Sequence, residues 1–309
     1  QGVDALGYVI SARDIEDHVA ELVEQTEITQ ICPARIVGLM SGSETVNVSL
    51  KQNEQSINLT AKLVIGADGG QSKVRQLANI GVTSWDYAQH AMVLYIETDY
   101  EQQDITWQRF VLSGPQAFLP LTDNYGSLVW YNSATEVKRL KALPTDELLV
   151  ELMATFPDCL GKVNKILGVA SFPLKRQHAQ EYVKKGVALV GDAAHTINPL
   201  AGQGVNIGLL DAAMLAEVLI EAQERGKDIA DINVLKRYER LRRFENLKMM
   251  TVMDVFYQAF SHDSTPLKML RNLGLGLAEK VAPLKYKVMR GAMGLEGRLP
   301  KLAKGEKLV

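Results

Sequence analysis

Two stretches of the chain share one pattern, in which an apolar strand ends in a carboxylate beside glycine and a helix follows. Lys62 to Gly70 reads KLVIGADGG, and Gly186 to Asp211 reads GVALVGDAAHTINPLAGQGVNIGLLD. Short apolar runs of this kind are typical of buried parallel strands, and open α/β sheets bind ligands at the carboxyl ends of such strands. Asp-Gly taken alone is more often a plain turn, but its repetition favours a ligand-binding role for Asp68 and Asp192.

Before the first of these stretches, the pattern predicts a helix and several short strands. An apolar, strand-like piece from Leu6 to Ile10 precedes a helix that Ser11 caps. Residues 28–65 then alternate like a β-meander inserted in an α/β domain. Its strands are expected at Arg35–Leu39, Val46–Leu50 and Ile57–Leu59.

Residues 81–175 predict a separate antiparallel sheet and one helix, Thr145–Phe156. The strands are expected at Met92–Glu97, Trp107–Val111, Ala117–Leu121, Ser127–Tyr131 and Val169–Leu174. Aromatic residues concentrate here, and they form either a wall of an apolar substrate cavity or ordinary core. They are Trp107, Phe110, Phe118, Trp130 and Tyr131.

The C-terminal part predicts two helices, one running to Gln223 and a long one over Val234–Phe260. A basic run on the long helix is interpreted as a solvated face rather than a binding site. It contains Lys236, Arg237, Arg240, Arg242 and Arg243. The basic, amphipathic tail 265–297 either lies on an anionic membrane surface or packs on its own domain.

Composition indicates a globular protein and narrows the function. The chain has 309 residues, of which 47% are hydrophobic and 23% charged, and a net charge of -2 gives no general attraction to nucleic acid. The only cysteines, Cys32 and Cys159, lack metal-ligand spacing, so we expect two buried thiols and no metal site. No apolar run approaches the roughly 18 residues of a membrane span.

The chemistry of the second stretch points to a flavin. A carboxylate at a strand end suits a ligand rich in hydroxyl groups, such as a ribitol chain. The helix that begins after Gly202-Gln203-Gly204 directs free N–H groups at a developing negative charge, which a reduced isoalloxazine ring carries. We therefore expect an FAD whose ribitol lies near Asp192 and whose ring lies over Pro199 to Asn206.

The same residues resemble the signature of class A flavin monooxygenases, in particular the hydroxylases of ubiquinone biosynthesis. The matching motif is Gly191-Asp192-Ala193-Ala194-His195, then Pro199, then Gly202 to Gly208 and Asp211. Asn198 stands before Pro199 where the common form of the family has His, and this resembles the demethoxyubiquinol hydroxylase branch. Further similarities are LVIGADGGQSKVR, AFLPLTDN, SLVWY and PLKMLRNLGL.

The resemblance implies a fold and a set of residue roles. The fold is α/β, with a Rossmann-like FAD/NAD(P)-binding domain of the p-hydroxybenzoate hydroxylase type, an antiparallel substrate-binding sheet and C-terminal helices. Pro199 would lie near the flavin carbon to which oxygen adds, and His195 would organise the loop rather than act as a general base. These two are the catalytic candidates. The cofactor-binding candidates are Asp68, Gly69, Arg75, Gly191, Asp192, Pro199, Gly202, Gln203, Gly204, Val205 and Asn206.

The implied reaction is hydroxylation of the aromatic ring of a polyprenylated quinol or phenol precursor of ubiquinone. NAD(P)H would reduce FAD, and O₂ would add to give a C4a-hydroperoxide that transfers its distal oxygen. The alternatives are an FAD-dependent reductase of prenyl chains and a non-catalytic, membrane-associated subunit of a quinone-biosynthesis complex. The expected location is the bacterial cytoplasm, peripheral to the inner membrane, with a homo-oligomer as a further possibility.

One motif of the family does not occur in this sequence. The Gly-x-Gly-x-x-Gly that binds the FAD pyrophosphate is absent, and the chain starts with Gln1. We expect a truncated N-terminus that lacks on the order of 100 residues, with weak or no FAD binding and no activity in the fragment itself. The expected segments are 1–80 and 181–225 for the FAD-binding domain, 81–180 for the substrate sheet and 226–309 for a helical region.

Overall fold

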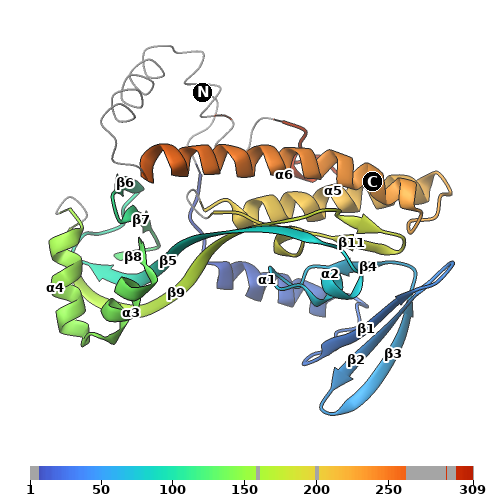
Figure 1. Cartoon of the computed structure of the whole chain (residues 1–309), viewed down its shortest axis with the longest axis horizontal. Helices are drawn as coiled ribbons and strands as arrows, with labels where there is room; N and C mark the ends of the chain where they lie inside the picture. Colours follow the sequence, from blue (N-terminus) through green and yellow to red (C-terminus); the bar gives the residue numbers. More distant parts are fainter. Residues whose placement is uncertain (1–6, 158–160, 199–201, 262–289, 291–296, 309) are drawn as a thin grey trace. The chain divides into compact units, whose positions relative to one another are not determined.

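A computed structural model of the chain describes residues 7–157, 161–198, 202–261, 290 and 297–308 (Figure 1). The chain divides into two compact units, each assembled from segments that are distant in sequence. Unit 1 comprises Gln1–Thr29, Asp86–Leu174 and Tyr257–Val281, and unit 2 comprises Gln30–Trp85, Lys175–Phe256 and Ala282–Val309. Every candidate site residue belongs to unit 2.

The two apolar runs of the repeated pattern pair with each other in unit 2. β4 (Val64–Gly66) and β11 (Val187–Leu189) are parallel, with Val64 opposite Val187 and Gly66 opposite Leu189. β10 (Val183–Lys184) joins the other side of β11 in antiparallel orientation. Because parallel strands in register end at the same edge of a sheet, the loops that follow β4 and β11 begin side by side.

Helices α2 (Lys73–Leu77), α5 (Gly204–Glu224) and α6 (Ile232–Ser261) build the core of unit 2 around β11. On α5, Met214, Leu215, Val218 and Ala222 recur at helical spacing and are all buried, so one face of the helix packs inward. Val187, Ala188 and Leu189 are fully buried, as expected for a strand covered on both faces.

The predicted meander is present in unit 2 as β1 (Arg35–Ser41), β2 (Val46–Gln52) and β3 (Gln55–Ala61), paired in the order β1-β2-β3 (Figure 1). Asn53 and Glu54 connect β2 to β3 with φ of 44° and 70°. Positive φ at both central residues is the geometry of a tight two-residue hairpin turn, so these residues set the register of the pair.

Unit 1 is built on antiparallel strands, helix α1 (Ala12–Glu24) and two helices in its core. A six-stranded sheet has the order β12-β9-β5-β8-β7-β6. The bounds of its strands are Val82–Thr98 (β5), Trp107–Val111 (β6), Gly114–Pro120 (β7), Tyr125–Ser133 (β8), Val163–Ala179 (β9) and His195–Thr196 (β12). The long strands β5 and β9 pass from one unit into the other, and β12 belongs to unit 2. Helices α3 (Ala134–Ala142) and α4 (Thr145–Thr155) share the core of unit 1 with the strands, and α3 was not predicted.

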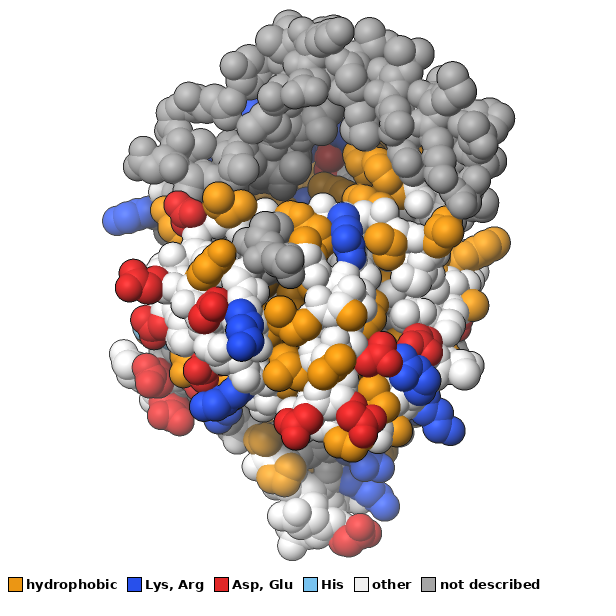
Figure 2. All heavy atoms as spheres, turned by 90° about the vertical axis from the view of Figure 1, so that its left-hand side faces the viewer, with side chains coloured by type: hydrophobic (Ala, Val, Ile, Leu, Met, Phe, Trp, Pro, Cys, Tyr) orange, Lys and Arg blue, Asp and Glu red, His pale blue; other side chains and the backbone are white. Residues whose placement is uncertain are grey.

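The aromatic residues of unit 1 mainly fill its core. Phe118, Trp130 and Tyr131 are buried, and Trp130 meets Phe156 of the core edge to face, with ring centroids 5.7 Å apart. For these three residues, the hypothesis of ordinary core therefore holds rather than that of a cavity wall. On the face that carries α3 and α4, acidic, basic and apolar side chains are interspersed (Figure 2).

Besides helix α3, the structure departs from the predictions at three places. Gly7–Ile10 forms no strand, and Cys32 is exposed rather than buried. Arg242, assigned to a solvated face, is 3% exposed, because the hydrophobic spacing of α6 turns this position inward, where a carboxylate meets it. Cys159, and the tail 265–297 apart from Arg290 and Gly297, lie outside the described residues. Within the described residues no helix is long and apolar enough to span a membrane.

Candidate functional site

The loop after β4 is ordered by its own polar side chains. Asp68 Oδ2 accepts hydrogen bonds from the backbone N–H groups of Lys73, at 2.6 Å, and Val74, at 3.1 Å. Ser72 caps α2, because its hydroxyl accepts from Arg75 N at 2.9 Å. Both interactions satisfy N–H groups that the first turn of a helix leaves without partners. One carboxylate oxygen of Asp68 is thus engaged by the first turn of α2.

Arg75 connects the two loops that follow the parallel strands. Its guanidinium donates to Gly70 O and to Ala193 O, both at 2.8 Å, and its side chain is 5% exposed. Burial lowers the pKa of Arg75, and the negative charge of Asp68 partly opposes this change. The planar group satisfies one buried and one partly buried carbonyl at once, so it holds the first loop against the second.

The loop after β11 turns sharply at Gly191, whose φ is 57°. A Cβ added at Gly208 would lie 3.2 Å from the Cα of Gly191, so this turn and the second turn of α5 approach backbone to backbone. At Gly208 a larger residue would require a displacement, and at Gly191 the positive φ favours glycine. The Gly-Asp turn is therefore fixed against the helix that follows it.

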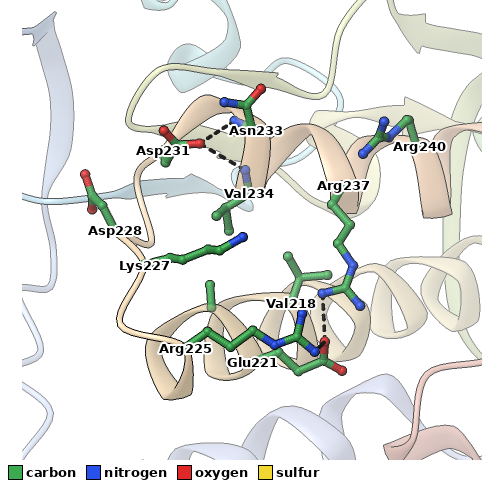
Figure 3. A pocket seen from close by; sticks show the side chains of 11 residues that line it. Val218, Glu221, Arg225, Lys227, Asp228, Asp231, Asn233, Val234, Arg237 and Arg240 are labelled. Carbon is green, nitrogen blue, oxygen red and sulfur yellow. Dashed lines mark hydrogen bonds and ion pairs between the residues drawn. The ribbon is translucent and has the colours of Figure 1, made fainter.

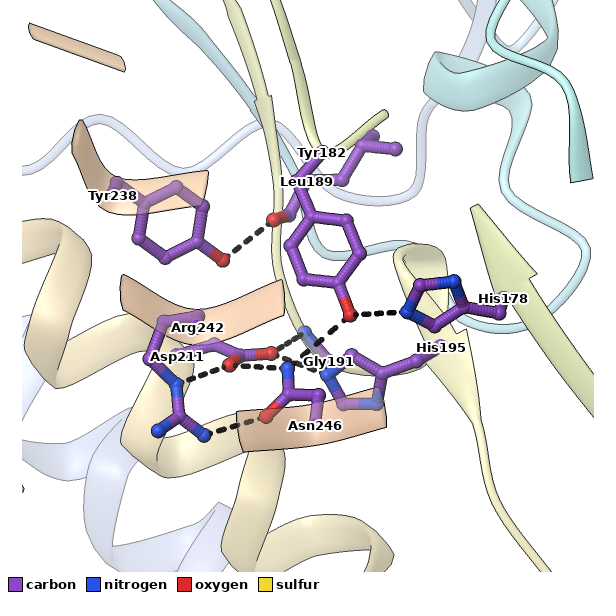
Figure 4. Close-up of polar contacts among 9 residues, drawn as sticks. All are labelled: His178, Tyr182, Leu189, Gly191, His195, Asp211, Tyr238, Arg242 and Asn246. Atoms are coloured by element: carbon purple, nitrogen blue, oxygen red, sulfur yellow. Dashed lines mark hydrogen bonds and ion pairs between the residues drawn. The ribbon is translucent and has the colours of Figure 1, made fainter. Parts of the chain in front are cut away.

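A buried cluster beneath this turn centres on Asp211 of α5 (Figure 4). Asp211 Oδ2 accepts from Gly191 N at 3.2 Å and from His195 Nε2 at 2.5 Å. Burial alone would raise the pKa of Asp211, but the hydrogen bond from His195 and the charges of His195 and Arg242 outweigh it, and the pKa is lowered. An ionised Asp211 can only accept, so the Nε2 of His195 carries a proton and serves as donor.

Asp192 differs from Asp211 in having no such partners. Among the described residues, no hydrogen-bond donor or cation contacts its carboxyl group. Burial raises the pKa of Asp192, and the charge of His195 opposes the shift. The residue is nevertheless exposed, so its carboxyl group is accessible to a ligand. Hydroxyl groups of a ligand could donate hydrogen bonds to it.

The start of α5 provides an open cradle next to this carboxyl group. A Cβ added at Gly202 or Gly204 would meet no atom of the described residues within 4 Å, and Gly202 has a φ of 62°. Val205 and Leu209 are 61% and 55% exposed, although both are apolar. Gln203 Oε1 accepts from Asn206 Nδ2 at 3.4 Å. Free N–H groups of the first turn, open space and apolar side chains together suit a flat, partly anionic ring.

Two further polar atoms near the loops have no hydrogen-bond partner among the described residues. Thr196 Oγ1 and Gln177 Oε1 are buried without a hydrogen bond. Thr196 and Gln177 are paired residues of β12 and β9, and both side chains approach Gly70. Together with Asp192 and the glycine cradle, they make the site polar on one side and open on the other. These residues fit FAD, which combines hydroxyl-rich and flat parts.

The structure thus gathers most of the predicted residues around two adjacent loops. Asp68 and Gly69 lie on the first, with Arg75 on α2 just after it, and Gly191 and Asp192 lie on the second, with His195 at the start of β12. Pro199 lies outside the described residues. Sequence reasoning gave no site role to Arg242 and Asn246, which bond to Asp211. It also gave none to Tyr182 and His178, which continue the network from Asn246. The sequence signal that could have identified Arg242 and Asn246 is their spacing of four residues on the inward face of α6.

A separate hollow of about 530 Å³ lies between the C-terminal part of α5 and the start of α6 (Figure 3). Its cations are partly neutralised, since Arg237 lies 2.7 Å and Arg225 3.8 Å from Glu221. It shares no residue with the two loops. Within the described part of the chain, no group of three or more His, Cys, Asp or Glu residues could hold a metal ion.

Comparison with known proteins gives concordant matches. Residues 11–251 match the FAD binding domain family. The chain is 43% identical to 3-demethoxyubiquinol 3-hydroxylase of Escherichia coli, over 94% of this chain and 73% of the relative. It is 38% identical to ubiquinone hydroxylase UbiL of Rhodospirillum rubrum, over 97% of this chain and 70% of the relative. Its structure resembles p-nitrophenol 4-monooxygenase PnpA of Pseudomonas putida, with a TM-score of 0.75, 20% identity, and 94% and 73% of the two chains covered.

Proposed function

Because this chain belongs to the FAD-dependent hydroxylases of ubiquinone biosynthesis, we propose that it hydroxylates the aromatic ring of a polyprenylated quinol precursor. The comparisons confirm the predicted family, the fold class, FAD as cofactor and the monooxygenase type of enzyme. The observation that carries the proposal is the pair of parallel strands β4 and β11, whose adjacent loops present Asp192 and the open start of α5.

Each part of the site has a role in holding the cofactor. Asp192 would accept hydrogen bonds from the ribitol hydroxyls, which its exposed carboxyl group can reach. Gly202, Gln203, Gly204, Val205 and Asn206 would cradle the pyrimidine edge of the ring, where the first turn of α5 directs N–H groups. Asp68, Gly69 and Arg75 would shape the pyrophosphate side by ordering the first loop. When bound, FAD supplies the redox and oxygen chemistry, with NAD(P)H as electron donor.

Two further roles concern protons and water. His195 would keep the Gly191–Asp192 turn in place, because its Nε2 proton is held by Asp211. Val205 and Leu209 would exclude water from the face of the ring, since both present apolar side chains beside the cradle. The role of Pro199 beside the reacting carbon stays a prediction.

We also propose a peripheral location at the bacterial inner membrane, with quinone-biosynthesis proteins or a second copy of the chain as possible partners. A polyprenyl substrate partitions into the bilayer, and the 265–297 tail has the composition of a surface-binding helix. Co-sedimentation with phosphatidylglycerol vesicles tests this location. A chain ending near Ser264 should remain in the supernatant if the tail is responsible, and equal sedimentation of both forms would exclude that role.

The function is tested by complementation of strains that lack individual ubiquinone hydroxylases, using the full-length protein. The strain that regains ubiquinone identifies the step, and mass spectrometry of its accumulated intermediate identifies the substrate. Incubation with ¹⁸O₂ should place one labelled oxygen in the product. Oxidation of NAD(P)H without labelled product, or reduction of the prenyl chain, would contradict hydroxylation and favour the reductase alternative.

A further inference from the structure

One face of α6 is bonded to the strand that leads into the flavin loop (Figure 4). Tyr238 Oη donates to Leu189 O, the last residue of β11, at 2.8 Å. Four and eight residues further along α6, Arg242 and Asn246 both reach Asp211. Residues four apart lie on the same face of a helix, so this face is polar and buried at successive turns.

The two α6 side chains occupy the oxygen of Asp211 that faces away from the loop. Arg242 Nε donates to Asp211 Oδ1 at 2.7 Å, and Asn246 Nδ2 donates to the same oxygen at 2.9 Å. The other oxygen, Oδ2, holds Gly191 N and His195 Nε2. All four donors are therefore needed to satisfy one buried carboxylate, which would be strongly unfavourable without the charge of Arg242.

Asn246 extends the cluster to the neighbouring sheet. Its Oδ1 accepts from Arg242 at 2.7 Å, and its Nδ2 also donates to Tyr182 Oη at 3.3 Å. Tyr182 Oη in turn lies 3.2 Å from His178 Nε2 on β9. Every polar atom of the Asn246 side chain is thus engaged, so its position is determined by three neighbours.

We propose that Arg242 and Asn246 are positioning residues for the flavin loop. They hold Asp211 in one orientation, Asp211 holds the Gly191 N–H and the His195 ring, and the turn thereby sets the place of the Asp192 carboxyl group. Neither residue belongs to the loops that would contact the cofactor. The inference rests on the proposed function, since the loop matters to the reaction only if FAD binds there.

The test compares Asn246→Leu and Arg242→Met with Arg240→Met in the full-length protein. Leu has the branched shape of Asn with the same number of side-chain heavy atoms, and the variant keeps the Asp211–Arg242 ion pair, so Asn246→Leu stays informative if Arg242→Met fails to fold. Arg240 lies on the same helix but is exposed, and among the described residues it has no hydrogen bond or ion pair. Two quantities are measured: hydrogen exchange of residues 191–198 without cofactor, and the Kd for FAD.

We expect both cluster variants to speed exchange across 191–198 and to raise the Kd for FAD by about tenfold or more, the effect of losing a buried, charge-assisted hydrogen bond. Arg240→Met should stay within about twofold of wild type. The single variants Asp211→Asn and Arg242→Met are also combined. The double variant should bind FAD no more than about twofold worse than whichever single variant has the higher Kd, because the cluster acts as a unit.

Three results would overturn the inference, and a fourth would uphold it while refuting the proposed function. Unchanged exchange and affinity in Asn246→Leu would overturn the inference, as would a loss of melting temperature alone with the loop unaffected. Additive losses in the double variant would also overturn it. Faster exchange in the cluster variants, in a wild-type protein that binds no FAD, would uphold the positioning of the loop and refute the proposed function instead.

Discussion

His195 donates its Nε2 proton to Asp211 across 2.5 Å, and both side chains are buried. An Nε2 that is held in this way cannot also remove a proton from a substrate. We predict that His195→Gln, whose amide can replace the donor, keeps FAD affinity and the hydroxylation rate within about fivefold of wild type, whereas His195→Leu loses at least about tenfold in affinity.

Stopped-flow measurement of both variants distinguishes this role from general base catalysis. A base cannot be replaced by an amide, so a Gln variant with normal FAD binding and no hydroxylation would contradict the organising role. Asn233→Leu, a change of an exposed residue in the first turn of α6, serves as control.

Arg75 is expected to be the residue whose loss most directly separates the two loops. Arg75→Met removes both bonds to Gly70 O and Ala193 O and leaves two carbonyl groups without donors. The free energy of unfolding should fall by about 2–4 kcal/mol in urea denaturation. Lys73→Met changes an exposed neighbour and keeps the backbone bond to Asp68, so it should shift stability by less than about 0.5 kcal/mol. Equal effects of the two changes would contradict the bridging role.

Two glycines of the second stretch should respond differently to alanine. At Gly208 the new Cβ would lie 3.2 Å from Gly191 Cα, and the backbone must shift, so stability should fall by about 1–3 kcal/mol. At Gly204 the new Cβ would have no atom of the described residues within 4 Å, and alanine favours the helix, so stability should be kept or rise. FAD titration and thermal melting check both. A Gly204→Ala protein with unchanged FAD affinity would argue against the cradle.

Stability should decline with acid in a window set by His178. Burial, and then the charges of Arg243, His195 and Arg176, lower the pKa of His178 to about 4. The unfolded state, with a pKa of about 6.5, therefore binds more protons between these values. The free energy of unfolding should fall by up to about 3 kcal/mol as the pH drops from 6.5 to 4, and the lowered pKa of Asp211 adds a further loss below about pH 4.

His178→Gln checks the assignment, because glutamine can still accept from Tyr182 but does not titrate in this range. Denaturation curves between pH 4 and 7 should be flatter for this variant than for wild type. The same slope in both proteins would place the acid sensitivity on another group.

Much of the site-bearing unit could be predicted, because its signals are local. Apolar runs that end in Gly and Asp define β4 and β11, and the glycines that follow define the start of α5. The meander is likewise given by alternation and by the turn at Asn53. Helix α3 was missed because its sequence, ATEVKRLKA, has only two buried positions, Val137 and Leu140, and follows a strand without a break.

The polar interior could not be predicted from such local patterns. Arg242 belongs to a basic run that looks solvated, and only the packing of α6 against Asp211, 31 residues away, shows that it is buried. Arg75 was predicted as a cofactor-binding candidate, but no local pattern indicates that its guanidinium donates to Ala193 O, 118 residues away. Long-range pairs of this kind leave no spacing signal in one sequence.

The central claim is that Asp192 and the start of α5 form the flavin site, and titration of FAD into the full-length apoprotein tests it most directly. Asp192→Ala should raise the Kd for FAD by about 10- to 100-fold, the range for a charge-assisted hydrogen bond, while keeping the wild-type melting temperature. Asp104→Ala, a change of an exposed carboxylate with no bond among the described residues, should bind like wild type. An Asp192→Ala protein that binds FAD as tightly as wild type would contradict the account.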